Sequence, residues 1–131
     1  MDSINEVTSN AKKSLSQKLL EEVALLLVEG EAVLQAFNIL GDVFAFTDQR
    51  LILIDKQWLT GKKVEYLSLP YRSITLFSVE TAGALGLDSE LKIWVSGTHT
   101  PIKWEFPQGT DIVTVQRMLA EGVLRKPRDT A

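Results

Sequence analysis

Cysteine is absent from the chain, and histidine occurs once, as His99. Without cysteine there is no disulfide framework, no thiolate nucleophile and no cysteine-ligated zinc. A single histidine leaves little room for a histidine-based metal site, and no G-x-S-x-G motif accompanies it to suggest a serine hydrolase. We therefore expect a protein that is not an enzyme and that holds no metal and no cofactor.

The chain also lacks a long apolar run and an excess of positive charge. No stretch approaches about 18 uncharged apolar residues, so we expect no transmembrane helix, and the start, MDSINEV, does not resemble a secretory signal. Fourteen basic and 17 acidic residues give a net charge of −3. Because a field of that sign does not attract nucleic acid, we expect a protein that binds none. The absence of a signal and of a transmembrane helix leads us to expect a cytoplasmic protein.

The 131 residues, 45 % of them hydrophobic, are enough for one domain with its own core. The first 29 residues predict a helical segment, in which Leu15, Leu19, Val23 and Leu26 form an apolar stripe at helical spacing. Gly30 stands where a helix C-cap glycine usually lies.

Beyond Gly30 the apolar pattern changes to a period of two, which predicts seven strands. We place them at 32–39, 43–47, 50–56, 63–69, 74–80, 89–95 and 102–106. A second helix follows, capped by Thr110 or Asp111, with apolar positions at Ile112, Val115, Leu119 and Val123. The chain thus divides into a helical segment at 1–29, a β-rich domain at 30–125 and a polar tail at 126–131.

The hairpin around Asp48 and Gln49 is apolar on both of its faces. Phe44, Phe46, Leu51 and Leu53 share one face, and Val43, Ala45, Ile52 and Ile54 share the other. Since a half-solvated sheet alternates apolar with polar side chains, both faces must be covered. We assign the first face to the core, and the second to the N-terminal helix or to another subunit, two alternatives that the sequence leaves open.

The last two strands can pair in two registers that keep their apolar residues on one face. One register places Lys92 opposite Lys103 and Glu90 opposite Glu105, and the other places Lys92 opposite Glu105 and Trp94 opposite Lys103. Like charges directly opposite destabilise a sheet by up to about 1 kcal/mol per pair. We therefore predict the second register, with a four-residue loop at 97–100.

Seven strands followed by a helix is the element order of the pleckstrin-homology (PH) superfold. FTDQRLILID at 46–55 resembles the FT-x-x-RLIL strand pair of bacterial PH domains, and TGKKVEYLSLPYRSI at 60–74, FSVETAG at 77–83 and LDSELKIWVSG at 87–97 look like the blocks that follow it. The resemblance covers about residues 31 to 124 and is to the single-domain type. It implies a barrel of seven antiparallel strands in two nearly orthogonal sheets, capped by the C-terminal helix, and protomers assembled into a closed ring of about five copies.

Eukaryotic PH relatives bind phosphoinositides through basic residues in and around the first hairpin loop. Here that loop, at 38–42, holds no cation and one acid, whereas phosphate recognition needs Arg or Lys clusters. Lys56, Lys62 and Lys63 flank Trp58 in a later loop and are candidates for a weak anion contact. Three cations supply only about 1 kcal/mol each at an anionic surface, so membrane lipid is disfavoured as a partner.

Apolar residues in that loop and at strand positions are the remaining candidates for a site. Trp58, Trp94, Ile52 and Ile54 are the candidate oligomer or partner surface. We therefore expect a non-enzymatic, self-assembling PH-like domain that presents a surface to another protein, whose identity the sequence does not specify. The alternative is a lipid or membrane-surface binding module.

Overall fold

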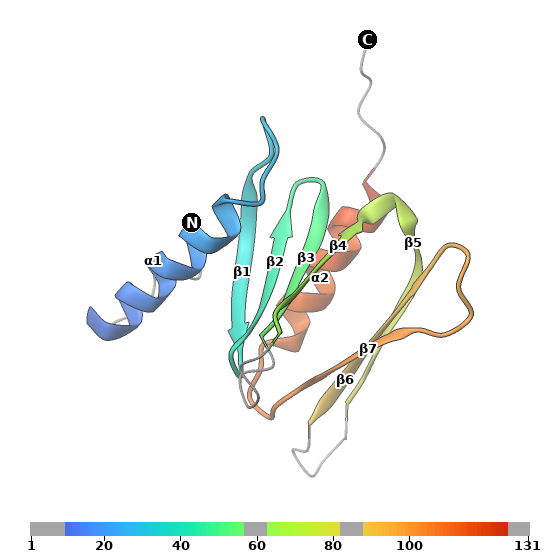
Figure 1. Ribbon diagram of the computed structural model, residues 1–131. Helices are drawn as coiled ribbons and strands as arrows, with labels where there is room; N and C mark the ends of the chain where they lie inside the picture. Colours follow the sequence, from blue (N-terminus) through green and yellow to red (C-terminus); the bar gives the residue numbers. More distant parts are fainter. Residues whose placement is uncertain (1–9, 57–62, 82–87, 126–131) are drawn as a thin grey trace. The chain divides into compact units, whose positions relative to one another are not determined.

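The computed structural model describes residues 10–56, 63–81 and 88–125, with side chains from residue 17 onward (Figure 1). The elements are α1 (Asn10–Ala24), β1 (Val33–Ile39), β2 (Asp42–Thr47), β3 (Arg50–Asp55), β4 (Glu65–Pro70), the 3-10 helix η2 (Tyr71–Ser73), β5 (Ile74–Glu80), β6 (Ser89–Val95), β7 (Ile102–Phe106) and α2 (Ile112–Leu124). The chain forms two compact units, Met1–Leu69 and Pro70–Ala131. Trp58, Lys62 and the predicted tail at 126–131 lie outside the described residues.

The first unit is a four-stranded sheet with the order β1-β2-β3-β4 (Figure 1). Its central hairpin pairs Phe44 with Leu53 and Phe46 with Leu51, and between them Ala45 with Ile52. The residues of both faces are almost fully buried: Val43, Phe44, Ala45, Phe46, Leu51, Ile52, Leu53 and Ile54. The prediction that both faces of this hairpin are covered is therefore confirmed.

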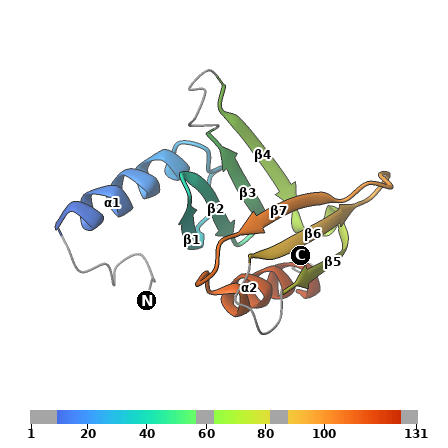
Figure 2. The same ribbon diagram turned by 90° about the horizontal axis from the view of Figure 1, so that it is seen from below.

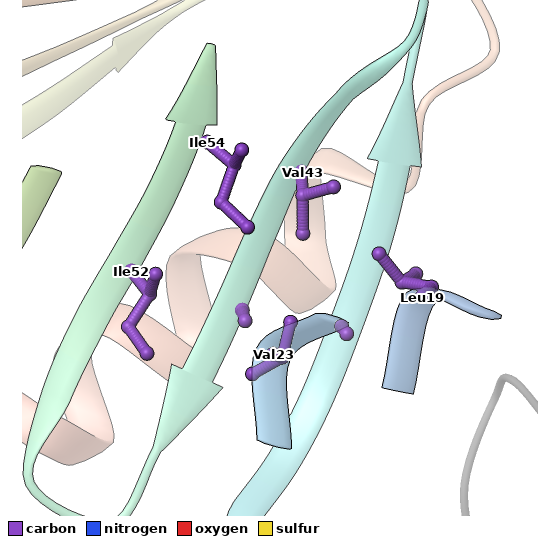
Figure 3. Packing of buried hydrophobic residues seen from close by; sticks show 7 residues of the cluster. Leu19, Val23, Val43, Ile52 and Ile54 are labelled. Carbon is purple, nitrogen blue, oxygen red and sulfur yellow. The ribbon is translucent and has the colours of Figure 1, made fainter. Parts of the chain in front are cut away.

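Helix α1 of the same chain covers the aliphatic face of the hairpin. Leu19 and Val23 project from α1 onto Val43, Ile52 and Ile54, as Figure 3 shows. Leu20, Leu26, Leu27 and Val33 close the margins of this cluster. Of the two alternatives left open by the sequence, the structure has the N-terminal helix, and Ile52 and Ile54 consequently lie inside the protomer and not on its surface.

A hydrogen-bonded ion pair fastens the segment after α1 to the turn between β2 and β3. Arg50 donates from Nε to Glu31 Oε2 at 2.8 Å and from Nη2 to Glu31 Oε1 at 3.0 Å. The Glu31 side chain is 1 % exposed and the Arg50 side chain 20 %. Thr47 Oγ1 donates to Glu31 Oε2 at 2.7 Å, and the Val28 amide donates to Oε1 at 3.0 Å. The buried carboxylate is thereby satisfied by four donors, which a buried charge requires.

The same arginine determines how the segment after α1 runs. The helix ends at Ala24, six residues before Gly30, and two residues further on the Leu26 carbonyl accepts a hydrogen bond from Arg50 Nη2 at 2.6 Å. The expectation of Gly30 as a helix C-cap is therefore wrong. Gly30 has a φ of +83° and lies in a turn in which the Glu31 amide donates to the Val28 carbonyl. Glycine adopts that backbone conformation without steric cost, so the turn can direct Glu31 inward.

The second unit is a three-stranded antiparallel sheet with the order β5-β6-β7, accompanied by α2 (Figure 2). Asp111 is the N-cap of α2, and its carboxylate accepts a hydrogen bond from the Thr114 amide at 3.1 Å. This confirms one of the two predicted caps. Val115 and Leu119 are the buried positions of the helix. A methyl group on Gly122 would lie 2.5 Å from the Tyr71 ring, so the glycine permits the close approach of α2 to η2.

The register of the last hairpin differs from the prediction. The structure pairs Lys92 with Lys103 and Glu90 with Glu105, the arrangement that the like-charge argument rejected. Charges of opposite sign alternate along each strand, and Lys92 Nζ lies 3.9 Å from Glu90 Oε1 on its own strand. This neighbour compensates the like charge across the ladder. The turn also favours the observed register, since Gly97 has a φ of +85° and the Thr98 amide donates to the Val95 carbonyl.

Glu31→Gln should test how much the buried ion pair stabilises the fold. Burial raises the pKa of Glu31, but hydrogen bonds from Arg50, Thr47 and Val28 outweigh burial and leave the pKa below its ordinary value of 4.5. The ionised carboxylate therefore stabilises the folded chain above that value, and the stabilisation is lost as the pH falls through the lowered pKa. At neutral pH the substitution should reduce the free energy of unfolding by about 3 kcal/mol, since it leaves a largely buried Arg50 without its counter-charge.

Urea denaturation of both proteins across the acid range measures this difference. The difference in free energy of unfolding between wild type and Glu31→Gln should become smaller as the pH falls. Glu22→Gln is the matched control, because it removes the more exposed Lys56–Glu22 pair and should change stability by less than about 1 kcal/mol. A gap that stays constant from neutral to acid pH would contradict the assignment.

Candidate interaction surfaces

The described cations of the predicted anion-contact loop do not gather into a phosphate site. Lys56 Nζ bonds Glu22 Oε1 at 2.9 Å, and its backbone amide donates to Asp42 Oδ1 at 3.1 Å. Burial raises the pKa of Asp42, and the nearby Asp55 adds to that effect. Lys63 is exposed and lies just before β4. In the described part of this region Lys56 is thus paired with a carboxylate, and Lys63 is the other described cation of the loop. The two side chains do not form a cluster of positive charge.

The β1–β2 turn carries no charge at its tip. Ile39 pairs with Asp42, so the turn consists of Leu40 at a φ of +54° and Gly41 at +91°. Two successive positive φ angles are characteristic of the type I′ hairpin turn, in which Asn and Gly are the preferred residues. Asn38 Oδ1 accepts the Gly41 amide at 3.1 Å, and the Leu40 side chain is 70 % exposed. An apolar side chain therefore occupies the place where phosphoinositide binding needs cations.

The outward face of the β5-β6-β7 sheet is arranged in three bands that cross the strands. Cross-strand pairing aligns Leu76 with Trp94 in an apolar band. The next band aligns Ser78, Lys92 and Lys103, and the third aligns Glu80, Glu90 and Glu105. We call this surface the banded face. Trp94, predicted as a partner-surface residue, lies in its apolar band and is partly exposed.

Sequence reasoning placed Trp94 on a candidate surface but missed the banded face as a whole. The bands exist only in the observed register, since the predicted one would have alternated the charges across β6 and β7. The sequence nevertheless contained a signal for the charged bands. Glu90 and Lys92 are two residues apart, and Lys103 and Glu105 have the same spacing in the opposite order.

Other kinds of site find no support within residues 10–56, 63–81 and 88–125. In these ranges no group of three or more His, Cys, Asp or Glu side chains is placed to hold a metal ion. His99 is exposed in the β6–β7 loop. Among the helices of the described chain, none is both long and apolar enough to cross a membrane.

A four-stranded sheet, a three-stranded sheet and a C-terminal helix in this order define a PH-like fold, with an N-terminal helix added. The bacterial PH domain family matches residues 3–123, and the chain belongs to that family. The resemblance seen in the FT-x-x-RLIL block is therefore confirmed.

Relatives and solved structures agree with this assignment. The chain is 48 % identical over 121 residues to the uncharacterized protein YjqA of Bacillus subtilis (strain 168), covering 92 % of this chain and 97 % of YjqA. It is 31 % identical to YozO of the same organism, covering 86 % and 93 %. A PH domain from Shewanella amazonensis SB2B superposes with a TM-score of 0.76 at 47 % identity, covering 83 % and 88 %. A DUF1696-family protein with a PH domain from Shewanella loihica PV-4 gives 0.71 at 45 %, covering 82 % and 92 %.

Exchanging two charges on β7 tests the register that creates the bands. In the double variant Lys103→Glu/Glu105→Lys, each cross-strand pair of like charges becomes a pair of opposite charges, while the net charge stays the same. We expect the free energy of unfolding to rise by about 0.5–1 kcal/mol. The predicted register would instead place two lysines, at 92 and 105, directly opposite. A loss of stability in thermal denaturation would therefore contradict the observed pairing.

Proposed function

We propose that this chain is a self-associating PH-like module that presents its sheet surfaces to another protein and catalyses no reaction. PH domains are generally non-enzymatic. The observation that carries the proposal is the exposure of apolar side chains on sheet strands. Tyr66 in β4 is 51 % exposed and Leu76 in β5 is 52 % exposed. Since the β2–β3 hairpin is filled on both faces within the protomer, we place the subunit contacts on these outer strands.

A closed ring of about five copies is the assembly that we propose. Contacts between different surfaces of two copies close into a ring when the rotation between neighbours allows it. Strands β4 and β5 expose different apolar residues, which suits such a contact between unlike surfaces. Exposed apolar groups at an edge strand favour association, because burying them removes apolar area from water.

Light scattering at micromolar concentration tests self-association. The wild type should have a mass several times the 14.6 kDa of the chain. Tyr66→Glu and Leu76→Glu should shift the mass toward that of the monomer, since each would bury an unpaired charge in the proposed apolar subunit contact. Leu124→Glu is the matched control, as it places the same charge at an exposed leucine on α2 and should leave the mass unchanged. A wild type of 14.6 kDa would refute the proposal.

Lipid binding is the alternative function, and the exposed Leu40 and the exposed Lys63 are the features that would support it. We expect no headgroup-selective binding at physiological salt, because the β1–β2 turn has no cation and the chain has a net charge of −3. Any residual attraction should disappear with salt, since exposed charges are screened within about 8 Å at 0.15 M. Co-sedimentation with phosphoinositide vesicles that persists at that salt and distinguishes headgroups would favour lipid instead.

A further inference from the structure

Strand β5 is an edge strand without the protection that edge strands usually have. The described hydrogen bonds pair it with β6 on one side, and it is the first strand of its sheet. Natural edges are blunted by Lys, Pro or short length. The sequence of β5, ITLFSVE, has seven residues, no Lys, no Arg and no Pro, and its irregularity is confined to its first residues. Its outer edge forms no hydrogen bond with another strand of the described chain.

The opposite edge of the same sheet is protected in each of these ways. Strand β7 has five residues, begins directly after Pro101 and ends directly before Pro107. Its outward residues are Lys103 and Glu105, and both are exposed. The contrast between the two edges indicates that the openness of β5 is particular to β5 and is not a general property of this sheet.

The banded face reaches this open edge, because each band ends on β5. Leu76 ends the apolar band, Ser78 the basic band and Glu80 the acidic band. Like charges held in register across a sheet lower its stability. They also create alternating potentials along β5, to which an added strand would be exposed. A strand added to β5 would continue the bands with its own outward side chains.

We propose that β5 accepts an extended segment of a partner protein as an added antiparallel strand. This proposal rests on the protein-interaction function above and names the surface and the chemistry of the partner. Main-chain hydrogen bonds supply affinity in strand addition, and alternate side chains supply specificity. The acidic band calls for a Lys or Arg opposite Glu80, the basic band for an acid opposite Ser78, and the apolar band for an apolar residue opposite Leu76.

The inward face of β5 determines the two remaining positions of the partner segment. Phe77 and Val79 point to the other side of the strand from Ser78 and are partly exposed, so apolar residues should lie opposite them. Read from its N-terminus, the antiparallel segment is basic, apolar, acidic, apolar, apolar. The peptide core KVEVL has this pattern.

A second copy of β5 fits this edge less well. Antiparallel pairing centred on Ser78 would place Glu80 of each copy opposite Leu76 of the other, a charge against an apolar residue. Pairing centred on Glu80 would bring two carboxylates together, which is destabilising. We therefore assign the edge to a partner segment, and occupation by a second copy becomes an outcome of the test.

Fluorescence anisotropy with labelled peptides tests the proposal on the full chain. The probe is KVEVL in a neutral flanking sequence, and the matched control is EVKVL, with the same composition and its two charges exchanged. We expect KVEVL to bind with a dissociation constant at least about fivefold lower. In EVKVL the charge opposite Glu80 becomes repulsive, and the charge opposite Ser78 becomes like that of Lys92 in the same band. N-methylation of alternate amides in KVEVL should abolish binding, because it removes the donors that pair with β5.

Two charge variants locate the bound peptide. Glu80→Lys should remove the preference for KVEVL over EVKVL. Glu105→Lys, in the same acidic band but on the protected edge, should leave it unchanged. Absence of KVEVL binding, equal binding of both peptides, or binding that survives N-methylation would each overturn the proposal.

Light scattering on the same samples separates this inference from the proposed function. An oligomeric protein that binds neither peptide overturns strand addition by a partner and leaves self-association in place. If Leu76→Glu then dissociates that oligomer, a second copy occupies the edge of β5, which explains why neither peptide binds. A monomeric protein that binds KVEVL selectively supports strand addition and refutes self-association.

Discussion

The first unit depends on the ion pair between Glu31 and Arg50. Breaking it would release three segments at once, because Arg50 also bonds the Leu26 carbonyl at the end of the helical segment and Ser68 Oγ of β4 at 2.9 Å. A buried carboxylate is costly unless donors surround it, so the pair forms only when these segments are all in place. This requirement makes the packing of α1 on the sheet cooperative with the β2–β3 turn.

The same constraint explains the FT-x-x-R block. Thr47 and Arg50 are the polar members of that block, and Thr47 Oγ1 accepts the amides of Gln49 and Arg50 at 3.0 and 2.9 Å while it bonds Glu31. The sequence predicted the strands and the two apolar faces, because periodicity reports them directly. It did not predict the partner of Arg50, since Glu31 lies 19 residues away and no local pattern links the two.

The charge register was missed for a different reason. The rule that like charges repel across strands considers one pair at a time, whereas Glu90 lies beside Lys92 along the strand as well as opposite Glu105. The energies of the two arrangements therefore differ by little, and the turn at Gly97 decides between them. Departures from a local sequence rule are often found at functional surfaces. That argument turns the failed prediction into support for the banded face.

The tip of the first hairpin and the edge of β5, the proposed site of strand addition, differ in the chemistry of recognition that they can support. A phosphate site depends on concentrated charge, and Leu40 and Gly41 supply none. An edge strand instead recognises a partner through main-chain hydrogen bonds, which a protein with a net charge of −3 can form as readily as a basic one. Charge then contributes selectivity more than affinity, because exposed pairs are weak. Recognition of this kind should be less sensitive to salt than headgroup binding, since its main-chain component involves no counter-ions.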